Sequence, residues 1–535
     1  MTRIVLFSLI LFVMNGYAAT VLASTPESVR DAVARVSTQP ATQSAGQRLH
    51  RFYDARSYRP LWNEPKHRAE LLDQLHELRD DGLDPGWYGF AHLEQQFSQH
   101  ASGSLPPELE IEASRAYLQA IIDLTLGRVT PERPEAVWRF GDHTLAPGED
   151  FIVVRAALDG DDLAAAFDEA RPRHFGYRAL RDHHRTLREE VPAPAPPPVP
   201  EGAALRSGTR DDRVVALRAR LSHAGHPALP QGDAALYDPA LEEVVKRFQE
   251  EQRLARDGIV GPATLTALNR SHATQLRQVR VNLERLRWVA HDLRSRLLLS
   301  NIPSAEIEYL ADGRSIWSAR AQVGRTDRPT PALISEITHF TVNPTWTIPP
   351  TIMRNDKLPQ IRRDLGYLER NNLRVIDHDG NTLSPTEVDW NNPSGIMLRQ
   401  TAGPHNALGR VAIRFPNPFL VYLHDTPNQS IFDRDNRGVS SGCVRVETAT
   451  DLVALIIEDR DGNGEERLNR ALQSGRTQEV RLDNPVPVLL AYWTVTADEA
   501  GTIHYLSDIY NRDEALLDLI EASATPAWRP LHAAR

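Results

Sequence analysis

The spacing of apolar residues predicts helices in the first part of the chain. One helix is marked by leucines at helical intervals, Leu71, Leu72, Leu75 and Leu78. It ends near Gly82 and Pro85, and a second helix runs from about Leu109 to Leu126. We therefore predict a mostly helical scaffold domain over residues 24–190. Its residues contain no catalytic constellation.

A proline-rich run separates this domain from a smaller helical unit. Residues 191–210 contain VPAPAPPPVP, which predicts a stiff, extended linker because proline lacks the backbone donor. Residues 211–270 predict three helices, the middle one with apolar residues at Leu241, Val244, Val245 and Phe248. Residues 271–293 predict one connecting helix.

The pattern then changes to that of strands. Residues 296–302, 306–310 and 315–323 predict strands, with Asp312-Gly313 as a hairpin turn, and further strands are expected at 337–342, 419–424 and 486–496. We predict a β-rich domain over 294–496, interrupted by a polar, helical insertion at about 350–395. Thr448 and Asp451 resemble a capping box that opens a helix. A C-terminal segment, 497–535, follows. The predicted fold class is multidomain α+β.

Length, charge and the N-terminal segment limit the classes of function that this chain can have. A length of 535 residues indicates several domains, and a net charge of −10 argues against nucleic acid as the main partner. Residues 1–23 have Arg3, a short apolar run and a small-residue site at Val21-Leu22-Ala23, which is typical of a cleavable signal peptide. An uncleaved anchor is the alternative. We expect export to the periplasm of a Gram-negative bacterium.

The chemistry centres on Cys443, the one cysteine in the sequence. His424 follows a strand-like run and precedes Cys443 by 443 − 424 = 19 residues. This separation is long enough for a loop to leave the strand and bring Cys443 back beside His424. A nearby imidazole can take the proton of a thiol and make the sulfur an acyl-transfer nucleophile. The alternative is a small buried cysteine that serves packing.

The surrounding residues resemble the active-site signature of the L,D-transpeptidases, cysteine enzymes that cross-link peptidoglycan. The matching residues are His424, Thr426, Pro427, Ser440, Gly442, Cys443, Val444 and Arg445. Ser441 departs from the pattern, because many members have a second histidine there. Other segments resemble the scaffold, the peptidoglycan-binding module and the capping insertion of the large members. The three-helix unit could equally be a structural bundle, and the insertion a peripheral packing element rather than a lid.

The resemblance implies a thioester between Cys443 and a tetrapeptide stem, release of D-Ala, and attack by the amine of a second stem to form a 3-3 cross-link. His424 would be the base, and the N–H groups of Gly442 and Cys443 would hold the oxyanion. Further oxyanion or substrate candidates are Ser441, Arg445, Tyr422, Asn406 and Trp346. Arg445 could bind a carboxylate or brace the loop.

Two other functions remain open from the sequence. Water in place of the acceptor amine would give an L,D-carboxypeptidase, and a chain that had lost catalysis would be a peptidoglycan-binding protein. His405 lies beside Asn406, but no carboxylate or histidine cluster accompanies it. We therefore expect no metal and no cofactor.

Overall fold

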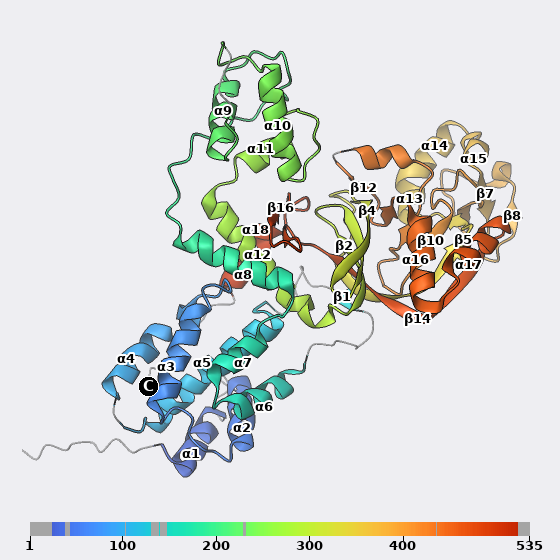
Figure 1. Cartoon of the computed structure of the whole chain (residues 1–535). Helices are drawn as coiled ribbons and strands as arrows, with labels where there is room; N and C mark the ends of the chain where they lie inside the picture. Colours follow the sequence, from blue (N-terminus) through green and yellow to red (C-terminus); the bar gives the residue numbers. More distant parts are fainter. Residues whose placement is uncertain are drawn as a thin grey trace, which may run out of the picture.

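The structure is a computed structural model that describes residues 24–37, 43–101, 103–129, 138–139, 147–227, 232–434 and 436–522. The predicted signal peptide lies outside these ranges. A helical lobe lies at one end of the molecule, a smaller three-helix lobe at the other, and a β-rich part beside them (Figure 1). The α+β fold class is confirmed. None of the helices in the described ranges combines the length and the apolar character needed to cross a bilayer.

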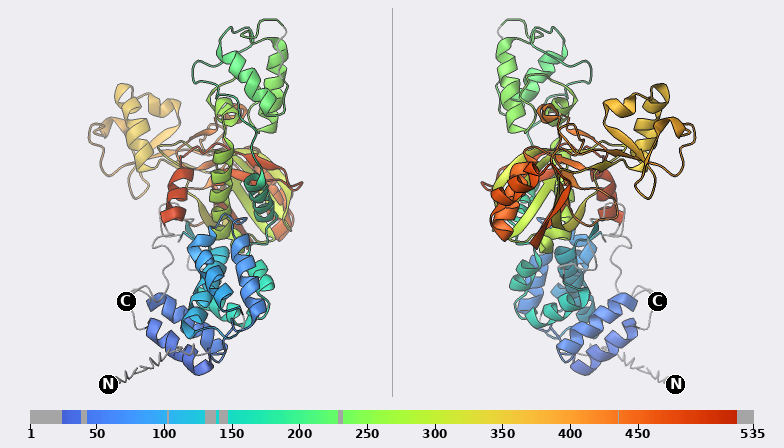
Figure 2. Two further views of the ribbon diagram at one scale, coloured as in Figure 1. Left: turned by 90° about the vertical axis from the view of Figure 1, so that its left-hand side faces the viewer. Right: turned by 90° about the vertical axis from the view of Figure 1, so that its right-hand side faces the viewer.

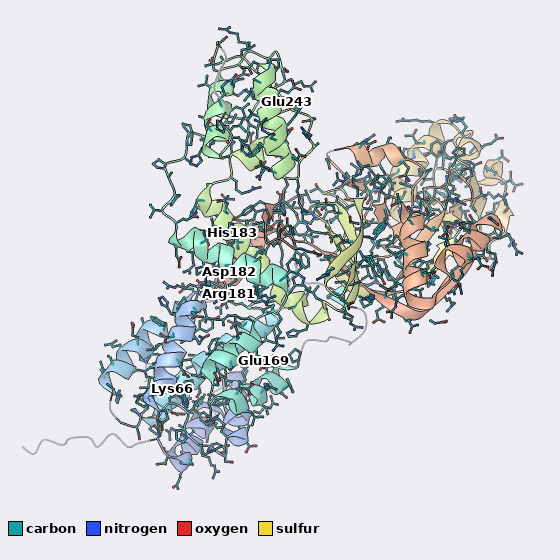
Figure 3. All side chains as sticks on the ribbon, viewed as in Figure 1. Lys66, Glu169, Arg181, Asp182, His183 and Glu243 are labelled. Carbon is teal, nitrogen blue, oxygen red and sulfur yellow. The ribbon has the colours of Figure 1, made fainter. Side chains whose placement is uncertain are left out.

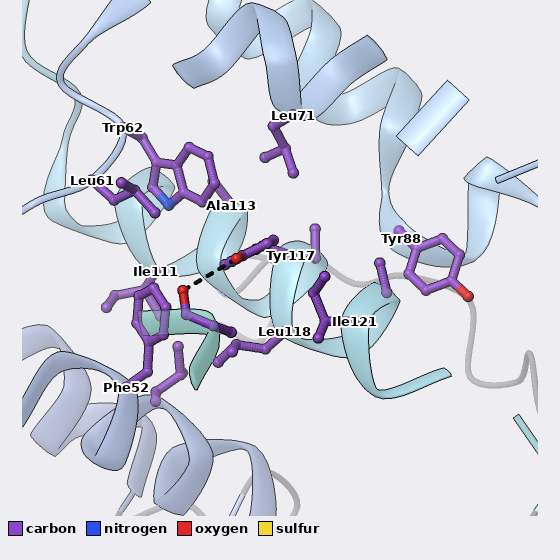
Figure 4. Packing of buried hydrophobic residues seen from close by; sticks show 14 of the residues in the cluster. Phe52, Leu61, Trp62, Leu71, Tyr88, Ile111, Ala113, Tyr117, Leu118 and Ile121 are labelled. Atoms are coloured by element: carbon purple, nitrogen blue, oxygen red, sulfur yellow. Dashed lines mark hydrogen bonds between the residues drawn. The ribbon is translucent and has the colours of Figure 1, made fainter. Parts of the chain in front are cut away.

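The N-terminal lobe is helical, as predicted. Its elements are α1 (Pro26–Ser37), α2 (Gln43–Ala55), α3 (Pro65–Glu77), a 3-10 turn (Pro85–Tyr88), α4 (Phe90–Gln99), α5 (Pro107–Leu126), α6 (Glu149–Asp159), α7 (Leu163–Ala170) and α8 (Phe175–Glu189). Helix α5 is buried along most of its length. In the core around α5, the rings of Trp62 and Tyr117 pack edge to face, with 5.9 Å between the ring centres (Figure 4).

The three-helix lobe consists of α9 (Arg213–His223), α10 (Pro239–Glu251) and α11 (Pro262–Leu268). Its core extends upstream of these helices, because Val199 and Leu205 are each 1% exposed and pack into it. The side-chain amide of Asn269 also pairs with both backbone groups of Val199, at 2.8 Å each. The exposed spacer therefore covers about 191–198, which corrects the predicted linker 191–210.

A buried ionic network joins the scaffold to α12 (His272–Val289), the predicted connecting helix, which a 3-10 turn (Ala290–Asp292) follows. Arg287 of α12 donates to Glu284 at 2.8 Å and to the backbone carbonyl of Asp81. The Asp81 carboxylate accepts bonds from Tyr177 and Arg181 of α8 at 2.9 and 3.1 Å. Figure 3 labels Arg181 at this junction. Because both members of the Arg287–Glu284 pair are 1% exposed, losing either would leave a buried charge unpaired.

The catalytic candidate region is a sheet that closes on itself. Its strands are β2 (Arg296–Asn301), β3 (Glu306–Ala311), β4 (Arg314–Gly324), β5 (Leu333–Val342), β10 (Val411–Arg414), β11 (Leu423–His424), β12 (Gly438–Ser440), β13 (Val444–Val446) and β14 (Gln478–Ala491). The order β5-β10-β11-β13-β4-β3-β2-β14 closes because β14 also pairs with β5. The hairpin turn at Asp312-Gly313 is confirmed.

Helices α16 (Ala449–Asp461) and α17 (Gly464–Gln473) pack against one apolar face of this sheet. A 3-10 turn (Gln429–Asp433) precedes β12. The predicted capping box is wrong. Thr448 has φ +52° and makes no side-chain cap, so its hydroxyl does not serve α16. The strand predicted over 419–422 is also wrong. There the side chain of Asn417 accepts the N–H groups of Phe419 and Val421, and this turns the chain before β11 begins.

The insertion forms a lobe of its own that projects from the sheet (Figure 2). It contains β6 (Trp346–Thr347), α13 (Pro350–Ile352), a π-helical turn (Met353–Lys357), α14 (Leu358–Arg363), α15 (Tyr367–Arg370), β7 (Leu373–Ile376), β8 (Thr382–Leu383), a 3-10 turn (Pro385–Glu387) and β9 (Met397–Gln400). Its strands form a separate sheet in the order β6-β9-β7-β8. The insertion has a separate hydrophobic core, which includes Ile361, Val375 and Leu398.

Two further pairings lie at the borders of the β-rich region. The backbone of β1 (Trp138–Arg139), from the N-terminal part, pairs in parallel with Leu333 and Ile334 of β5. At the other end, β15 (Val495–Ala497) pairs with β16 (Ile503–Tyr505) across the boundary predicted at residue 496. Helix α18 (Asp513–Ala522) then packs on α12.

Candidate active site

Strand register brings the main candidates to one face of the sheet. Strands β11 and β13 are parallel neighbours, with Leu423 opposite Val444 and His424 opposite Arg445. Continuing that register places Tyr422 beside Cys443, whose next residue, Val444, donates to the Tyr422 carbonyl at 3.1 Å. Side chains alternate along a strand, so Tyr422, His424, Cys443 and Arg445 share a face while Leu423 and Val444 enter the apolar core.

His424 is 4% exposed, and its ring is fixed by one contact. Its Nδ1 lies 2.5 Å from the backbone carbonyl oxygen of Asp425. A carbonyl oxygen only accepts, so Nδ1 carries the hydrogen and Nε2 keeps its lone pair. Burial, followed by the positive charges of Arg445 and Arg414, lowers the pKa of His424 to about 3. The imidazole is therefore neutral at physiological pH.

Cys443 is half-buried and free of any disulfide. Burial raises the pKa of its thiol, while a hydrogen bond from the Tyr422 backbone and the charges of Arg414 and Arg445 lower it. The net direction is upward, so the sulfur is protonated in the free protein. Activation must accordingly come from proton transfer during the reaction rather than from a resting thiolate.

No hydrogen bond joins the thiol to the imidazole in the described part of the chain. His424 lies two residues further along β11 than Tyr422, the residue beside Cys443. The two side chains are thus diagonal neighbours on one face, a separation of roughly 7–8 Å between α-carbons for diagonal pairs. Catalytic hydrogen bonds are often long before substrate binds, so this geometry is that of an apo site.

The turn that carries Cys443 is held by hydroxyl groups. The Ser440 hydroxyl donates to the Cys443 carbonyl at 2.6 Å and accepts the Gly442 N–H at 3.1 Å. Thr330 donates to the Gly442 carbonyl at 2.9 Å. The expectation that both turn N–H groups face an oxyanion is therefore wrong for Gly442. The Cys443 N–H has no partner among the described residues and remains available. At φ +110°, Gly442 adopts a conformation that favours glycine.

Ser441 connects this turn to the insertion. Its hydroxyl accepts a bond from Arg328 at 3.1 Å, and the same guanidinium binds the Asp356 carboxylate with two bonds of 2.8 and 3.1 Å. Asp356 belongs to the π-helical turn of the insertion. Sequence analysis missed Arg328, whose place in a loop between β4 and β5 gave no periodic signal. We call Ser441, Arg328 and Asp356 the clasp.

Arg445 contacts a second residue that sequence analysis missed. Its Nη1 donates to the side-chain oxygen of Gln322 at 2.6 Å, across the β4–β13 pairing. Gln322 is 0% exposed. Both the Nε of Arg445 and the Nε2 of Gln322 are buried without a partner. In the apolar pattern of 315–323, no feature distinguishes Gln322 from any other polar residue that is buried in a core.

Tyr422 and Trp346 meet above the same face. Burial is the main reason that the pKa of Tyr422 is raised to about 12, and the side chains of Arg414 and of Trp346, from β6, act in the opposite direction. The Arg414 guanidinium lies 4.0 Å from the centre of the Tyr422 ring, whose centre is 5.7 Å from that of His424. Arg414, at the end of β10, was also missed, although a lone arginine that closes an apolar strand was a readable signal.

Asn406 does not join this group. It is 1% exposed, its amide donates to the Thr401 carbonyl at 2.9 Å, and its oxygen accepts the Leu408 N–H at 2.8 Å. The prediction that it contacts substrate is corrected accordingly: it braces its own loop. His405 beside it is exposed, and the described residues contain no group of three or more histidine, cysteine or acidic side chains arranged to hold a metal.

Three family matches cover this chain. Residues 295–460 match the L,D-transpeptidase catalytic domain, residues 47–183 match the scaffold domain, and residues 210–268 match the "Putative peptidoglycan binding domain". The matched catalytic stretch contains both Cys443 and His424. The three-domain organisation resembles what the sequence predicted.

The chain is also similar to individual proteins. A Haemophilus influenzae protein described as "Putative L,D-transpeptidase" is 34% identical over 289 residues, which are 53% of this chain and 57% of that protein. The chain thus spans little more than half of this relative's length. Solved L,D-transpeptidase structures from Mycobacterium smegmatis and Stackebrandtia nassauensis are 14% and 11% identical, with TM-scores of 0.17 and 0.20. They cover 37% and 55% of this chain, and 58% and 97% of their own.

Proposed function

We propose that this protein, whose residues 295–460 form an L,D-transpeptidase catalytic domain, joins peptidoglycan stem peptides by 3-3 cross-links through a thioester on Cys443. One observation carries the proposal. The β11–β13 register sets the thiol and an imidazole with a free Nε2 lone pair on one sheet face. The "Putative peptidoglycan binding domain" match at 210–268 supports the same substrate, and such a substrate requires export, to the periplasm in a Gram-negative bacterium.

The first half of the reaction forms the acyl-enzyme. Nε2 of His424 takes the proton of Cys443 as the sulfur bonds to the carbonyl carbon between the third and fourth stem residues. The Cys443 N–H donates to the oxyanion. The carbon–nitrogen bond then breaks, and the imidazolium returns its proton to the leaving D-Ala amine. Because the pKa of free His424 is about 3, the imidazolium exists only transiently.

The second half transfers the acyl group. The amine of a second stem attacks the thioester carbon and gives its proton to Nε2. The carbon–sulfur bond breaks, and the departing thiolate regains that proton. Water attacking in place of the amine would release a tripeptide, which is the L,D-carboxypeptidase outcome.

Muropeptides that carry tetrapeptide stems test the proposal. Purified protein should convert them to cross-linked dimers, whereas a hydrolase would give tripeptide monomers and a peptidoglycan-binding protein would give neither; mass spectrometry separates these outcomes. Cys443→Ala and His424→Ala should each abolish product while keeping the thermal unfolding temperature of the parent. Product formed by Cys443→Ala would reject the thioester.

The insertion supplies a lid in this proposal. Asp356 of the insertion reaches the Cys443 turn through the clasp, and the side chain of Trp346, at the root of the insertion, acts on Tyr422. Closure over the shared face would exclude water and favour the amine acceptor. Deleting residues 352–394 should therefore reduce turnover more than folding, and raise tripeptide relative to dimer. An unchanged rate and product ratio would assign the insertion a packing role.

A further inference from the structure

Two guanidinium groups beside Cys443 have no carboxylate partner in the described chain. Arg414 donates to the Thr341 hydroxyl at 3.3 Å and lies over the Tyr422 ring. Arg445 donates to the uncharged Gln322. Both charges act on Cys443 and on His424 and lower the pKa of each. The site is therefore positively charged in a protein whose net charge is −10.

The register shows how these cations flank the sulfur. Strand β10 is antiparallel to β11, with Ala412 opposite His424, so its continuation sets Arg414 beside Tyr422. Arg445 lies two residues beyond Cys443 on β13, and Gln322 lies opposite it on β4. All of these side chains share the face of the thiol. Strands lie about 4.8 Å apart, so β10 and β13, on either side of β11, are separated by roughly 10 Å, with Tyr422 and His424 between them.

Buried donors at the same place are left unpaired. Gln322 is 0% exposed and its Nε2 has no partner, and the Nε of Arg445 is buried in the same condition. Unpaired buried donors cost free energy and are rare in folded proteins. The same residues would donate to a carboxylate in the geometry that guanidinium and amide groups provide. An oxygen acceptor on a bound ligand would satisfy these donors.

We infer that Arg414, Arg445 and Gln322 form a carboxylate-binding subsite that aligns a stem peptide across Cys443. The inference rests on the proposed function and names the feature of the donor that the site recognises. Two carboxylates of a stem could fill it: the C-terminal one, or one on the side chain of the third residue. Arg414 is a positioning residue in this assignment. Its charge holds the peptide so that the scissile carbonyl lies at the sulfur.

The test measures binding rather than turnover, in full-length Cys443→Ala protein. Calorimetry would compare a free tetrapeptide stem, the same stem with an amidated C-terminus, and the same stem with an amidated third-residue side chain. Arg414→Gln, added to Cys443→Ala, should weaken the free stem about 10- to 100-fold, as expected for loss of a charge-assisted bond. The amidated form that lacks the recognised carboxylate should bind weakly to both proteins, and this identifies which carboxylate fills the site.

Arg481→Gln is the matched control, because Arg481 is exposed on β14 and pairs with Glu479. It should leave all three affinities unchanged, and Arg414→Lys should recover part of the loss. Equal affinity of Arg414→Gln for the free stem, equal losses for all three peptides, or no binding by any of them would overturn the inference. Carboxylate-dependent binding in the Cys443→Ala background, with no acyl-enzyme found by mass spectrometry when the parent protein is mixed with the tetrapeptide stem, would keep the subsite and reject the proposed function.

Discussion

Replacing Asp356 by Asn should loosen the insertion from the Cys443 turn. The substitution removes the charge that pairs with both Arg328 donors, at 2.8 and 3.1 Å, but keeps the shape of the side chain. The Arg328 side chain is 17% exposed and that of Asp356 is 36% exposed. Exposed ion pairs contribute about 0.2–1 kcal/mol, and two-bonded geometry places this pair near the upper end, at about 1 kcal/mol.

A loss of that size changes an opening equilibrium about five-fold. Hydrogen exchange followed by mass spectrometry should therefore show the amides of Met353–Lys357 exchanging about five-fold faster in Asp356→Asn. The peptide that spans Ser441 should also exchange faster, because Arg328 loses its anchor. Amides of β2 should be unaffected.

Asp364→Asn is the control for this experiment. Asp364 pairs with Arg370 within the insertion itself, so its loss does not touch the clasp. It should leave exchange around Ser441 unchanged. Unaltered exchange in Asp356→Asn, or the same change in both variants, would refute the claim that the clasp couples the insertion to the nucleophile turn.

Four further predictions follow from burial and backbone geometry. Because burial raises the pKa of Cys443 and Arg414 lowers it, the midpoint of iodoacetamide alkylation against pH should exceed that of an ordinary thiol and rise further in Arg414→Gln. Burial raises the pKa of Glu110 from 4.5 to about 7, so the unfolded scaffold loses this proton at a lower pH than the folded scaffold does. The free energy of unfolding, measured by hydrogen exchange of α5 amides, should therefore fall by about 3 kcal/mol between pH 4.5 and 7 and level off above pH 7. This pH dependence should be absent in Glu110→Gln. Glu284→Gln should cost about 3–5 kcal/mol in chemical unfolding, since it leaves Arg287 buried without its charge partner; an effect below about 1 kcal/mol would contradict the buried-pair argument. Gly442→Ala should lower the free energy of unfolding by about 1–3 kcal/mol, because residue 442 has φ +110°, and it should slow acylation. Unchanged acylation would show that the turn tolerates a side chain.

Local patterns predicted the elements that depend on local sequence. The helix over α5, the connecting helix and the hairpin at Asp312-Gly313 were found because periodicity and turn residues act within a few positions. The strand over 419–422 failed for a local reason that composition hides. One asparagine, Asn417, binds the backbone of the next residues and replaces strand pairing.

The site residues likewise include some that local sequence reveals and others that it does not. Cys443 and His424 stand in a compact motif and could be located from sequence. Gln322 and Arg414 act through strand neighbours that are distant along the chain, and their place depends on register, which apolar spacing does not encode. Asn406 illustrates the opposite error, because a polar residue within a family-like segment was interpreted as a substrate contact when its hydrogen bonds serve its own loop.

The pairing of β1 with β5 constrains how this protein can be made and cut. Residue 138 can pair only after residue 333, which is synthesised 333 − 138 = 195 residues later, so the scaffold cannot complete its attachments while the ribosome is still translating the three-helix lobe. A truncated enzyme that starts after the spacer would expose backbone donors and acceptors of Leu333 and Ile334 along an open strand border. Such a fragment would leave unpaired the backbone groups of two residues that the whole chain pairs, so it would not reproduce the intact border of β5.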